Sequence, residues 1–330
     1  PVPILALDPA SGQVTREGQV DDEQIDRYQI FNGQLFIPGH DPTQNWKLGN
    51  FYRREAGEEW RKVRTIPEAL HTYDLAWHGG RMYAGLGTKK GATVAVSADE
   101  GASWELQRLG RNRVYTFMAA DSTLYAVKGI PTAGQIAKAR QENEELYGMA
   151  ELRPDGTFAP RPDLTEAVLF PDGFNLEERM KKIVRPLTVD NKLLYIGAYV
   201  HNDHQFQPFG LYLARSLKEN RVEVQRVCLP LQYRPWDILV DGEYVYLLAE
   251  QEGGTGGKTV ARVLRARKEK LSDWEEYLHF AAPTFARSFE LLGEDFYFAL
   301  GSEINDADHW QPGELKPETG TLLRVRKLTK

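Results

Sequence analysis

Six stretches of the chain share one pattern, and the residues at its first and third positions could bind and transform an anionic ligand. Arginine occurs most often at the first position, and it is the side chain best suited to bidentate binding of a carboxylate, sulfate or phosphate. We therefore expect an anion-binding site with aromatic rings where these positions converge. The first residues are Asp26, His71, Arg113, Arg185, Arg234 and Arg287, and the third residues are Tyr28, Tyr73, Tyr115, Leu187, Trp236 and Phe289.

His71 interrupts the arginine series and lies two residues before Tyr73. Histidine titrates near neutral pH and a tyrosine hydroxyl can donate a proton, so His71, Tyr73 and Tyr115 are the candidate catalytic residues. The alternative is that His71 is a hydrogen-bonded structural residue, and that each arginine pairs with an acidic residue and ties adjacent repeats together. The predicted substrate-binding residues are Asp26, Arg113, Arg185, Arg234, Arg287, Trp236, His40 and His201.

Polar loops that follow the repeats supply His40 and His201 at the same predicted face. His201 and His204, with Asp203 between them, could bind a metal with help from another loop. A solvated polar loop is the favoured interpretation of this spacing, so no metal and no cofactor are expected. Further loop residues predicted at this face are Asp41, Trp46, Lys128, His309 and Trp310.

The elements that position these residues are six predicted β-hairpins. Pairs such as Asn32-Gly33, Gly79-Gly80 and Asp241-Gly242 separate alternating segments, as in tight hairpin turns. The repeats start at residues 26, 71, 113, 185, 234 and 287. Repeats of about 40–50 residues with four strands each are typical of a β-propeller. The sequence therefore predicts an all-β fold, a single β-propeller over residues 1–330 with six four-stranded blades, or seven if residues 130–184 conceal a degenerate blade.

Two insertions account for the long step between the third and fourth repeats. They lie near residues 130–146 and 163–184, and we expect helices over Gln135–Leu146 and Asn175–Ile183. The segment 322–327 repeats the segment 263–268, which makes it an outer strand of the last blade. That blade then lacks strands at its C-terminal end. We expect the N-terminal strands within residues 3–17 to supply them, so that N- and C-terminal strands close the ring.

Composition limits the classes of partner and compartment. The chain has 330 residues, a formal net charge of −6 and one cysteine, Cys228, which excludes an internal disulfide. The acidic balance gives no support to a nucleic-acid partner. No apolar run approaches the roughly 20 residues of a transmembrane helix. Because the sequence begins at Pro1 without a methionine, we expect a secreted or periplasmic protein whose signal peptide has been removed.

The segment Ser97–Trp104 reads S-A-D-E-G-A-S-W and matches the pattern S-x-D-x-G-x-x-W. In this pattern the aspartate folds back onto turn amides, the glycine takes a positive φ and the tryptophan packs beneath the turn. This turn, the Asp-box or BNR repeat, and the repeat pattern resemble the sialidase-like β-propeller superfamily. In that family such turns lie away from the active site, so no functional role is assigned to this one.

The resemblance implies a carbohydrate-active enzyme acting on a uronic, sialic or sulfated sugar at the mouth of the channel. Sialidases hold the substrate carboxylate with three arginines, and similar propellers include polysaccharide lyases and glycosidases that use His, Tyr and Arg. β-Elimination would use arginine to neutralise the carboxylate and His71 or a tyrosine to take the C5 proton. Hydrolysis would need two carboxylates, for which Asp26, Asp74, Asp237 and Glu290 are candidates. The expected partner is an acidic oligosaccharide or polysaccharide. The alternative is a non-catalytic propeller that binds an acidic glycan or a protein.

Overall fold

The structure is a computed structural model that describes residues 2–40, 47–171, 179–201, 205–229, 233–251, 259–301, 318 and 320–326. This part of the chain is built mainly from antiparallel β-strands, with two short α-helices and one 3₁₀ turn among the described residues. None of these helices is long and apolar enough to span a membrane. The chain divides into two compact units, unit 1 (Pro1–Leu164) and unit 2 (Thr165–Lys330).

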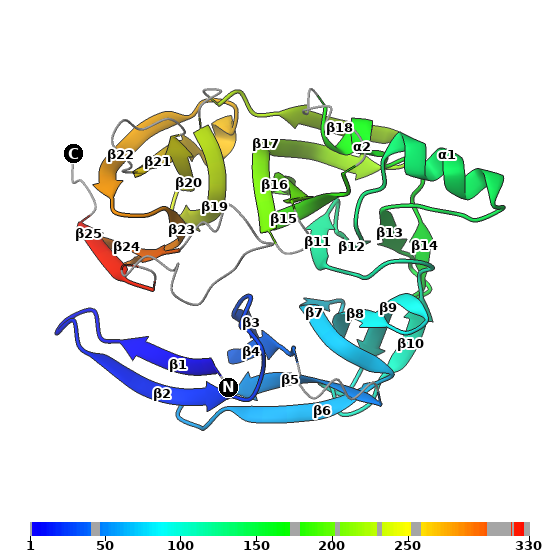
Figure 1. Cartoon of the computed structure of the whole chain (residues 1–330), viewed down its shortest axis with the longest axis horizontal. Helices are drawn as coiled ribbons and strands as arrows, with labels where there is room; N and C mark the ends of the chain where they lie inside the picture. The colour runs from blue at the N-terminus through cyan, green and yellow to red at the C-terminus, as the bar shows by residue number, and fades with distance from the viewer. Residues whose placement is uncertain are drawn as a thin grey trace. The chain divides into compact units, whose positions relative to one another are not determined.

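Unit 1 contains three four-stranded sheets, and in each the strands pair in chain order (Figure 1). An N-terminal hairpin forms a two-stranded sheet of its own, and helix α1 (Ala133–Gln141) follows the second strand of the third sheet. The strands are β1 (Val2–Leu7) and β2 (Val14–Val20); β3 (Gln29–Phe31), β4 (Gln34–Pro38), β5 (Leu48–Arg54) and β6 (Arg61–Pro67); β7 (Ala69–His78), β8 (Arg81–Thr88), β9 (Gly91–Ser97) and β10 (Glu105–Arg108); β11 (Thr116–Ala120), β12 (Thr123–Val127), β13 (Met149–Leu152) and β14 (Phe158–Pro160).

Unit 2 repeats this plan with two four-stranded sheets and, within the described residues, one three-stranded sheet. Helix α2 (Glu166–Leu169) precedes the first sheet, and the 3₁₀ turn η1 (Lys268–Lys270) lies in the second. The strands are β15 (Lys181–Val189), β16 (Lys192–His201), β17 (Gln205–Lys218) and β18 (Arg221–Arg226); β19 (Tyr233–Asp241), β20 (Tyr244–Gln251), β21 (Thr259–Arg267) and β22 (Glu275–Ala282); β23 (Ala286–Leu292), β24 (Asp295–Leu300) and β25 (Leu322–Arg326).

All six predicted hairpins are confirmed as the first two strands of the six large sheets. The turn chemistry explains their register. Asn32 and Gly33 have φ of 49° and 75°, and Asp190 and Asn191 have φ of 47° and 62°. Positive φ at both central positions gives the type I′ turn, whose twist matches that of the flanking strands. Asn, Asp and Gly adopt this conformation at the lowest cost.

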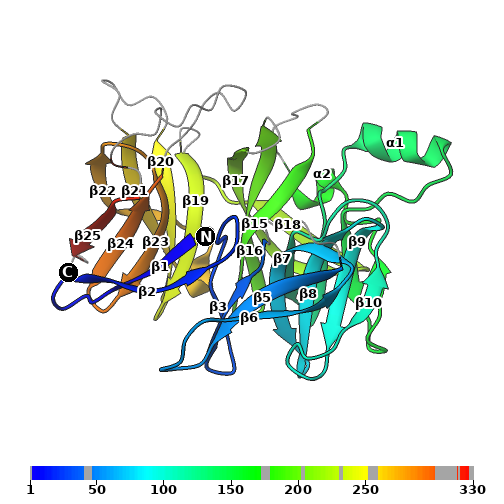
Figure 2. The same cartoon turned by 60° about the horizontal axis from the view of Figure 1, so that its bottom comes forward.

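Successive sheets pack face to face within each unit (Figure 2). In unit 1, Phe36 and Phe51 of the first sheet share a buried cluster with Leu75 and Met82 of the second. In unit 2, Phe296 of the third sheet packs in one cluster with residues of the second. Four-stranded antiparallel sheets stacked in this way are typical of propeller blades.

The helix predictions are partly wrong. Helix α1 begins behind the capping residue Thr132 and ends at Gln141, five residues before the predicted end. Of the second predicted helix, residues 175–178 lie outside the described part of the chain, whereas residues 181–183 are the start of strand β15. Pairing of Ile183 with Gly197 on β16 outweighs any local helix preference there. Strand β25 pairs with β24 as β21 pairs with β20, so it is an outer strand as predicted.

The turn at Ser97–Trp104 has the hydrogen bonds expected from its sequence. Asp99 accepts from the Ser103 amide at 2.8 Å, and Gly101 has a φ of 87°. The Trp104 indole donates to Thr65 at 3.0 Å. The hydrogen bonds from Ser103 lower the pKa of the Asp99 carboxyl to about 2. The turn therefore stabilises the outer edge of the second sheet.

Candidate functional site

Six of the predicted site residues lie together in unit 1, and we call them the His-Tyr-Arg cluster. The rings of His40 and His71 stack with centroids 5.1 Å apart and planes inclined by 28°. The Tyr73 ring meets both edge-on, at 5.4 Å from His40 and 5.9 Å from His71. Tyr115 meets Tyr73 at 5.3 Å. The members of the cluster are Asp26, His40, His71, Tyr73, Arg113 and Tyr115.

The backbone places His40 against the first strand of the second sheet. Residues His40 and His71 form an antiparallel bridge. The Thr72 amide donates to the Gly39 carbonyl at 2.8 Å. The buried Asp22 carboxylate accepts from the His40 amide at 2.7 Å. Because these bonds hold the segment on both sides, the His40 ring is fixed in position with only 4% of the residue exposed.

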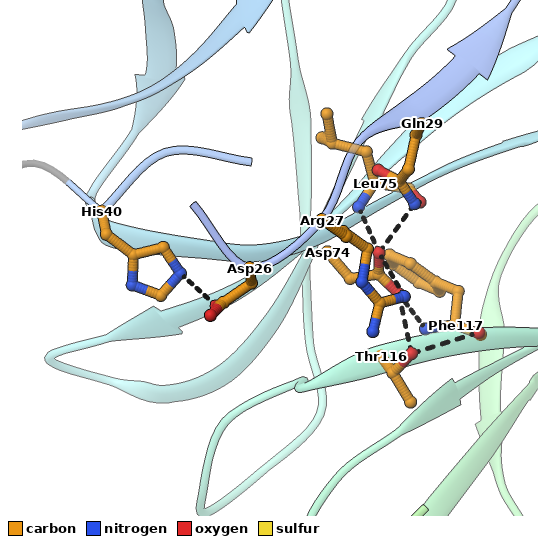
Figure 3. A network of polar contacts seen from close by, with 8 residues as sticks. All are labelled: Asp26, Arg27, Gln29, His40, Asp74, Leu75, Thr116 and Phe117. Atoms are coloured by element: carbon orange, nitrogen blue, oxygen red, sulfur yellow. Dashed lines mark hydrogen bonds and ion pairs between the residues drawn. The ribbon is translucent and has the colours of Figure 1, made fainter. Parts of the chain in front are cut away.

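Asp26 orients the His40 ring. The Nε2 atom of His40 lies 3.0 Å from Oδ2 of Asp26, and Figure 3 shows the two side chains pointing toward each other. Burial would raise the pKa of the Asp26 carboxyl, but the hydrogen bond and charge of His40 hold that pKa below its ordinary value.

Arg113 and Tyr73 form the polar end of the cluster. The Nη1 atom of Arg113 donates to the Tyr73 hydroxyl at 2.6 Å, and the guanidinium carbon lies 5.6 Å from the centre of the Tyr73 ring. Burial raises the pKa of Tyr73 to about 12, although Arg113 opposes the shift. Burial likewise raises the pKa of Tyr115. Tyr73 is protonated at neutral pH and can donate a proton, although burial makes it a weaker acid than an exposed tyrosine.

Gly87 on β8 is a residue of the site that the sequence analysis missed. A Cβ atom at this position would lie 3.0 Å from Cε2 of Tyr73 and 3.1 Å from Cγ of Arg113. The absence of a side chain thus lets Tyr73 and Arg113 approach the strand. The signal was present in the sequence, because the alternating glycines Gly85 and Gly87 inside a strand indicate close approach by another part of the chain.

A buried aspartate fixes the strand that carries Tyr73. The register of β7 against β8 shifts between Thr72 and Asp74, so Tyr73 is the extra residue of a β-bulge. The Asp74 carboxylate accepts from the amides of Leu75 at 2.9 Å and Phe117 at 2.7 Å. It accepts in addition from Arg27, Gln29 and Thr116, as Figure 3 shows. One carboxylate thereby links all three sheets of unit 1 beside the cluster.

Unit 2 contains a similar buried carboxylate, that of Asp237, and its arginine partner is Arg185. The Asp237 carboxylate accepts from the amides of Ile238 at 3.0 Å and Phe289 at 3.3 Å. The Nε atom of Arg185 lies 3.3 Å from it. Burial raises the pKa of Asp237, although Arg185 opposes the shift. Trp236 occupies the bulge position of Tyr73. Arg185 is thus the partner of a structural carboxylate, as in the alternative weighed for the arginines.

The other predicted residues of unit 2 have separate surroundings. The Trp236 indole donates to Glu250 at 3.1 Å, and its ring lies 4.8 Å from that of Phe285. Arg234 pairs in register with Glu250 across β19 and β20. Arg287 is exposed on β23. The side chain of His201 and all of Asp41, Trp46, Asp203, His204, His309 and Trp310 lie outside the described residues.

Within the part of the chain that the structure describes, no group of three or more His, Cys, Asp or Glu side chains could hold a metal ion. That finding does not apply to His201 and His204, because the His201 side chain and the whole of His204 lie outside the described residues. The cluster can donate a proton, accept a proton and bind an anion through chain groups alone.

No protein-family model and no curated protein sequence matches the chain. Among solved structures, a chain of the hydrazine synthase of Kuenenia stuttgartiensis is similar over 98% of this chain and 89% of that chain, with 11% identity and a TM-score of 0.56. This likeness shows a shared fold and carries nothing about activity.

Two further likenesses are weaker. An arabinanase of Bacillus subtilis is similar over 74% of this chain and 95% of its own, with 10% identity and a TM-score of 0.38. A glycoside hydrolase is similar over 86% of this chain and 70% of its own, with 12% identity and a TM-score of 0.42. TM-scores this low carry no argument about the present chain.

Proposed function

We propose that the chain is a carbohydrate-active enzyme that binds an acidic sugar at the His-Tyr-Arg cluster and cleaves it by β-elimination. The observation that carries the proposal is the contact of Arg113 with the protonated Tyr73, beside the stacked pair of His40 and His71. A cation, a proton donor and a proton acceptor then stand within one group of touching side chains. This is the set that removal of a proton next to a carboxylate requires.

In the proposed reaction, each proton is taken or given by a residue of the cluster. Arg113 binds the carboxylate at C5, which makes the C5 proton more acidic. His71, which is more exposed than His40, takes that proton. The C4–O bond breaks as a C4=C5 double bond forms, and Tyr73 protonates the leaving oxygen. His40, held by Asp26, keeps the His71 ring in place by stacking. Transfer of the proton from His71 to Tyr73 restores the starting state.

Hydrolysis of the same glycan has less support. It requires two carboxylates that can reach the scissile bond. Of the four candidates, Asp74 is 1% exposed and Asp237 is 8% exposed, and both are occupied by backbone amides and an arginine. Their geometry fits a structural role.

A second candidate function is binding of an acidic glycan without turnover. The pairing of Arg185 with Asp237 and of Arg27 with Asp74 favours the absence of turnover, and it favours a protein over an acidic glycan as the partner beside Asp237 in unit 2, because these arginines serve the fold and are not available to an anionic substrate. Arg113 differs, because it contacts a neutral tyrosine.

We also propose the finer architecture expected from the sequence, a six-bladed propeller closed by terminal strands. Its support is a count of strands: five sheets have four strands, one has three among the described residues, and the hairpin β1–β2 belongs to none of them. Since acidic polysaccharides are mainly extracellular, we propose an extracytoplasmic location as well.

The proposed function is tested by replacing the cation of the cluster. Arg113→Gln is expected to weaken binding of an acidic oligosaccharide at least about tenfold, because the carboxylate loses its charged partner. Isothermal titration with oligogalacturonate and with a neutral galactan of equal length measures this. Arg111→Gln, an exposed arginine two residues away, is the matched control. Equal losses for the acidic and neutral ligands would contradict the proposal.

A further inference from the structure

We propose that unit 2 carries a second binding site, for one acidic sugar residue of the same glycan, in a pocket at the turn end of the sheet β19–β22. The choice of ligand rests on the proposed function. The pocket has a volume of about 300 Å³. It lies where the β19–β20 hairpin turns, at the opposite end of this sheet from Arg234 and Glu250. None of its residues belongs to the sites described above.

Two aromatic residues form fixed walls of this pocket. Tyr244 begins β20, and Trp274 lies just before β22. The Trp274 indole donates to the Leu271 carbonyl at 2.8 Å, and Leu271 is only 2% exposed. Since the indole N–H is satisfied by the backbone, the ring is held in one orientation. A rigid aromatic face is a suitable surface for the apolar side of a sugar ring.

Arg265 supports these walls and is not available to a ligand. Its side chain pairs with Glu275 at 2.6 Å. The guanidinium carbon lies 4.8 Å from the ring centre of Tyr244 and 4.5 Å from that of Tyr277. The cation is thus neutralised and stacked between two tyrosines. Glu275 is used by the same pair, so it does not offset the other cations of the pocket.

Arg267 and Lys270 supply the remaining positive charge of the pocket. Both are exposed, and among the described residues neither has an acidic partner within ion-pair distance. The Arg267 guanidinium lies 5.3 Å from the Tyr244 ring. The Asp273 carboxylate accepts from the Ser272 hydroxyl at 3.2 Å. The lining therefore combines two aromatic faces with Arg267, Lys270 and one carboxylate, Asp273, and its charged residues leave a net positive charge, which matches a ring that bears a carboxylate or sulfate.

An acidic glycan fits these features better than a nucleic acid. The chain carries a net charge of −6, whereas nucleic-acid binding needs an extended basic surface. The volume of the pocket suits a single sugar residue, and a polysaccharide offers such residues along its length. Binding here would hold a long chain to the protein at a second point and raise its effective concentration at the cluster.

The test removes both cations. Arg267→Gln with Lys270→Gln is compared with Lys192→Gln and Lys218→Gln, which make the same change of charge on the sheet β15–β18. Retardation of the full chain is measured in gels that contain polygalacturonate, alginate, heparin or neutral dextran. We expect at least one acidic polymer to retard the native protein, with a Kd about tenfold weaker for the pocket variant and nearly unchanged for the control. Melting temperatures should agree among the three proteins.

Other outcomes would overturn the inference. It fails if the pocket variant and the control lose affinity equally, if none of the acidic polymers retards the native protein, or if a single-stranded oligonucleotide binds more tightly than every acidic polymer. Failure of the proposed function looks different. Loss of binding in the pocket variant without any turnover by the native protein would leave this site standing and remove the catalytic role. Turnover of short oligosaccharides should be equal in the pocket variant and the native protein.

Discussion

At the scale of single residues, the position of Tyr73 decides what the cluster can do. Its hydroxyl accepts from Arg113, its ring touches three other rings, and Gly87 leaves the space that it occupies. Tyr73 is protonated at neutral pH and can donate its proton, and Arg113 partly offsets the rise in its pKa that burial causes. Sequence reasoning identified the tyrosine and the arginine but not the glycine that admits them.

The substitution Gly87→Ala tests this packing. The new methyl group would lie 3.0 Å from Tyr73, so the ring and Arg113 must move by a few tenths of an ångström. We expect a loss of acidic-ligand affinity or turnover of about tenfold, with a cost in stability of about 1–2 kcal/mol from overpacking. Isothermal titration and thermal unfolding measure the two effects. Gly134→Ala, whose methyl group would meet nothing closer than 3.9 Å, is the control and should leave affinity unchanged. Unchanged affinity in Gly87→Ala would show that the fit around Tyr73 is unimportant.

A second buried ionisable residue, Lys128, should make the stability of the protein depend on pH. Its ammonium donates to the Leu109 carbonyl at 2.8 Å and lies 3.6 Å from the Tyr147 ring. Burial lowers the pKa of Lys128 to about 8 from 10.5. Below pH 8 both the folded and the unfolded chain are charged at this residue. Between pH 8 and 10.5 the unfolded chain binds more protons, so stability rises with pH.

We therefore expect the free energy of unfolding to increase by about 2 kcal/mol from pH 8 to 9.5. Lys128→Met should abolish this increase, whereas Lys138→Met, an exposed lysine of α1, should retain it. Chemical denaturation at a series of pH values gives the slopes. An increase that persists in Lys128→Met would assign it to other groups. Above pH 10 the raised pKa of Tyr73 acts in the opposite direction, because the unfolded tyrosine ionises first.

At the scale of elements, both units use one device to place an aromatic residue. A β-bulge in the inner strand of the second sheet presents Tyr73 or Trp236, and the aspartate that follows binds the third sheet. In each unit an arginine pairs with that aspartate. In unit 1 it is Arg27, which lies just before β3, and in unit 2 it is Arg185 of β15. Because both aspartates bind an amide of the next sheet and an arginine, we infer that they organise the sheets of the two units.

Asp74→Ala is expected to destabilise the protein by about 3 kcal/mol, because the carboxylate is buried and its loss leaves an arginine and two amides without their acceptor. Asp237→Ala should have an effect of the same sign in unit 2. Urea denaturation measures both. Glu290→Ala, an exposed carboxylate of β23, should change stability by less than about 0.5 kcal/mol. A cost for Asp74→Ala no larger than that of Glu290→Ala would contradict the structural role.

The hairpins could be predicted from the sequence, whereas the roles of individual arginines and one strand could not. Asn, Asp and Gly at the hairpin turns adopt a positive φ at low cost, as at Asn32-Gly33, Gly79-Gly80 and Asp190-Asn191, so the hairpins were predictable from local sequence. The roles of Arg113 and Arg185 were not, because both begin equivalent repeats and differ only in the residue that they contact across sheets. The segment 181–183 was mistaken for helix because its pairing with β16 involves residues far along the chain.

At the scale of the whole molecule, each of the two units contains three large sheets whose strands pair in chain order, and unit 1 contains the two-stranded sheet β1–β2 in addition. The last sheet is one strand short of the other five within the described residues. Among the described residues of its sheet, β25 pairs with β24 on one side and with no strand on the other. The proposed propeller closes this edge with an N-terminal strand.

Hydrogen exchange tests the closure. If the ring is closed, the amides of β25 that face away from β24 should exchange as slowly as those of β24, since each is hydrogen-bonded. Deletion of residues 1–20 should then accelerate their exchange at least about tenfold while the amides of β16 change little. Mass spectrometry of peptides from residues 320–326 gives the rates. Fast exchange of these amides in the intact chain would rule out an added strand.

The most direct test of the central claim is turnover of acidic oligosaccharides by the purified chain and by Tyr73→Phe. Ultraviolet absorbance of the new C=C bond and release of reducing ends are followed together on oligomers of galacturonate, mannuronate and glucuronate. The proposed function predicts that both signals rise with the native protein on at least one of these substrates. It predicts further that Tyr73→Phe loses at least about a hundredfold in kcat, as expected for a missing general acid. Reducing ends without absorbance, or full activity in Tyr73→Phe, would contradict β-elimination at this cluster.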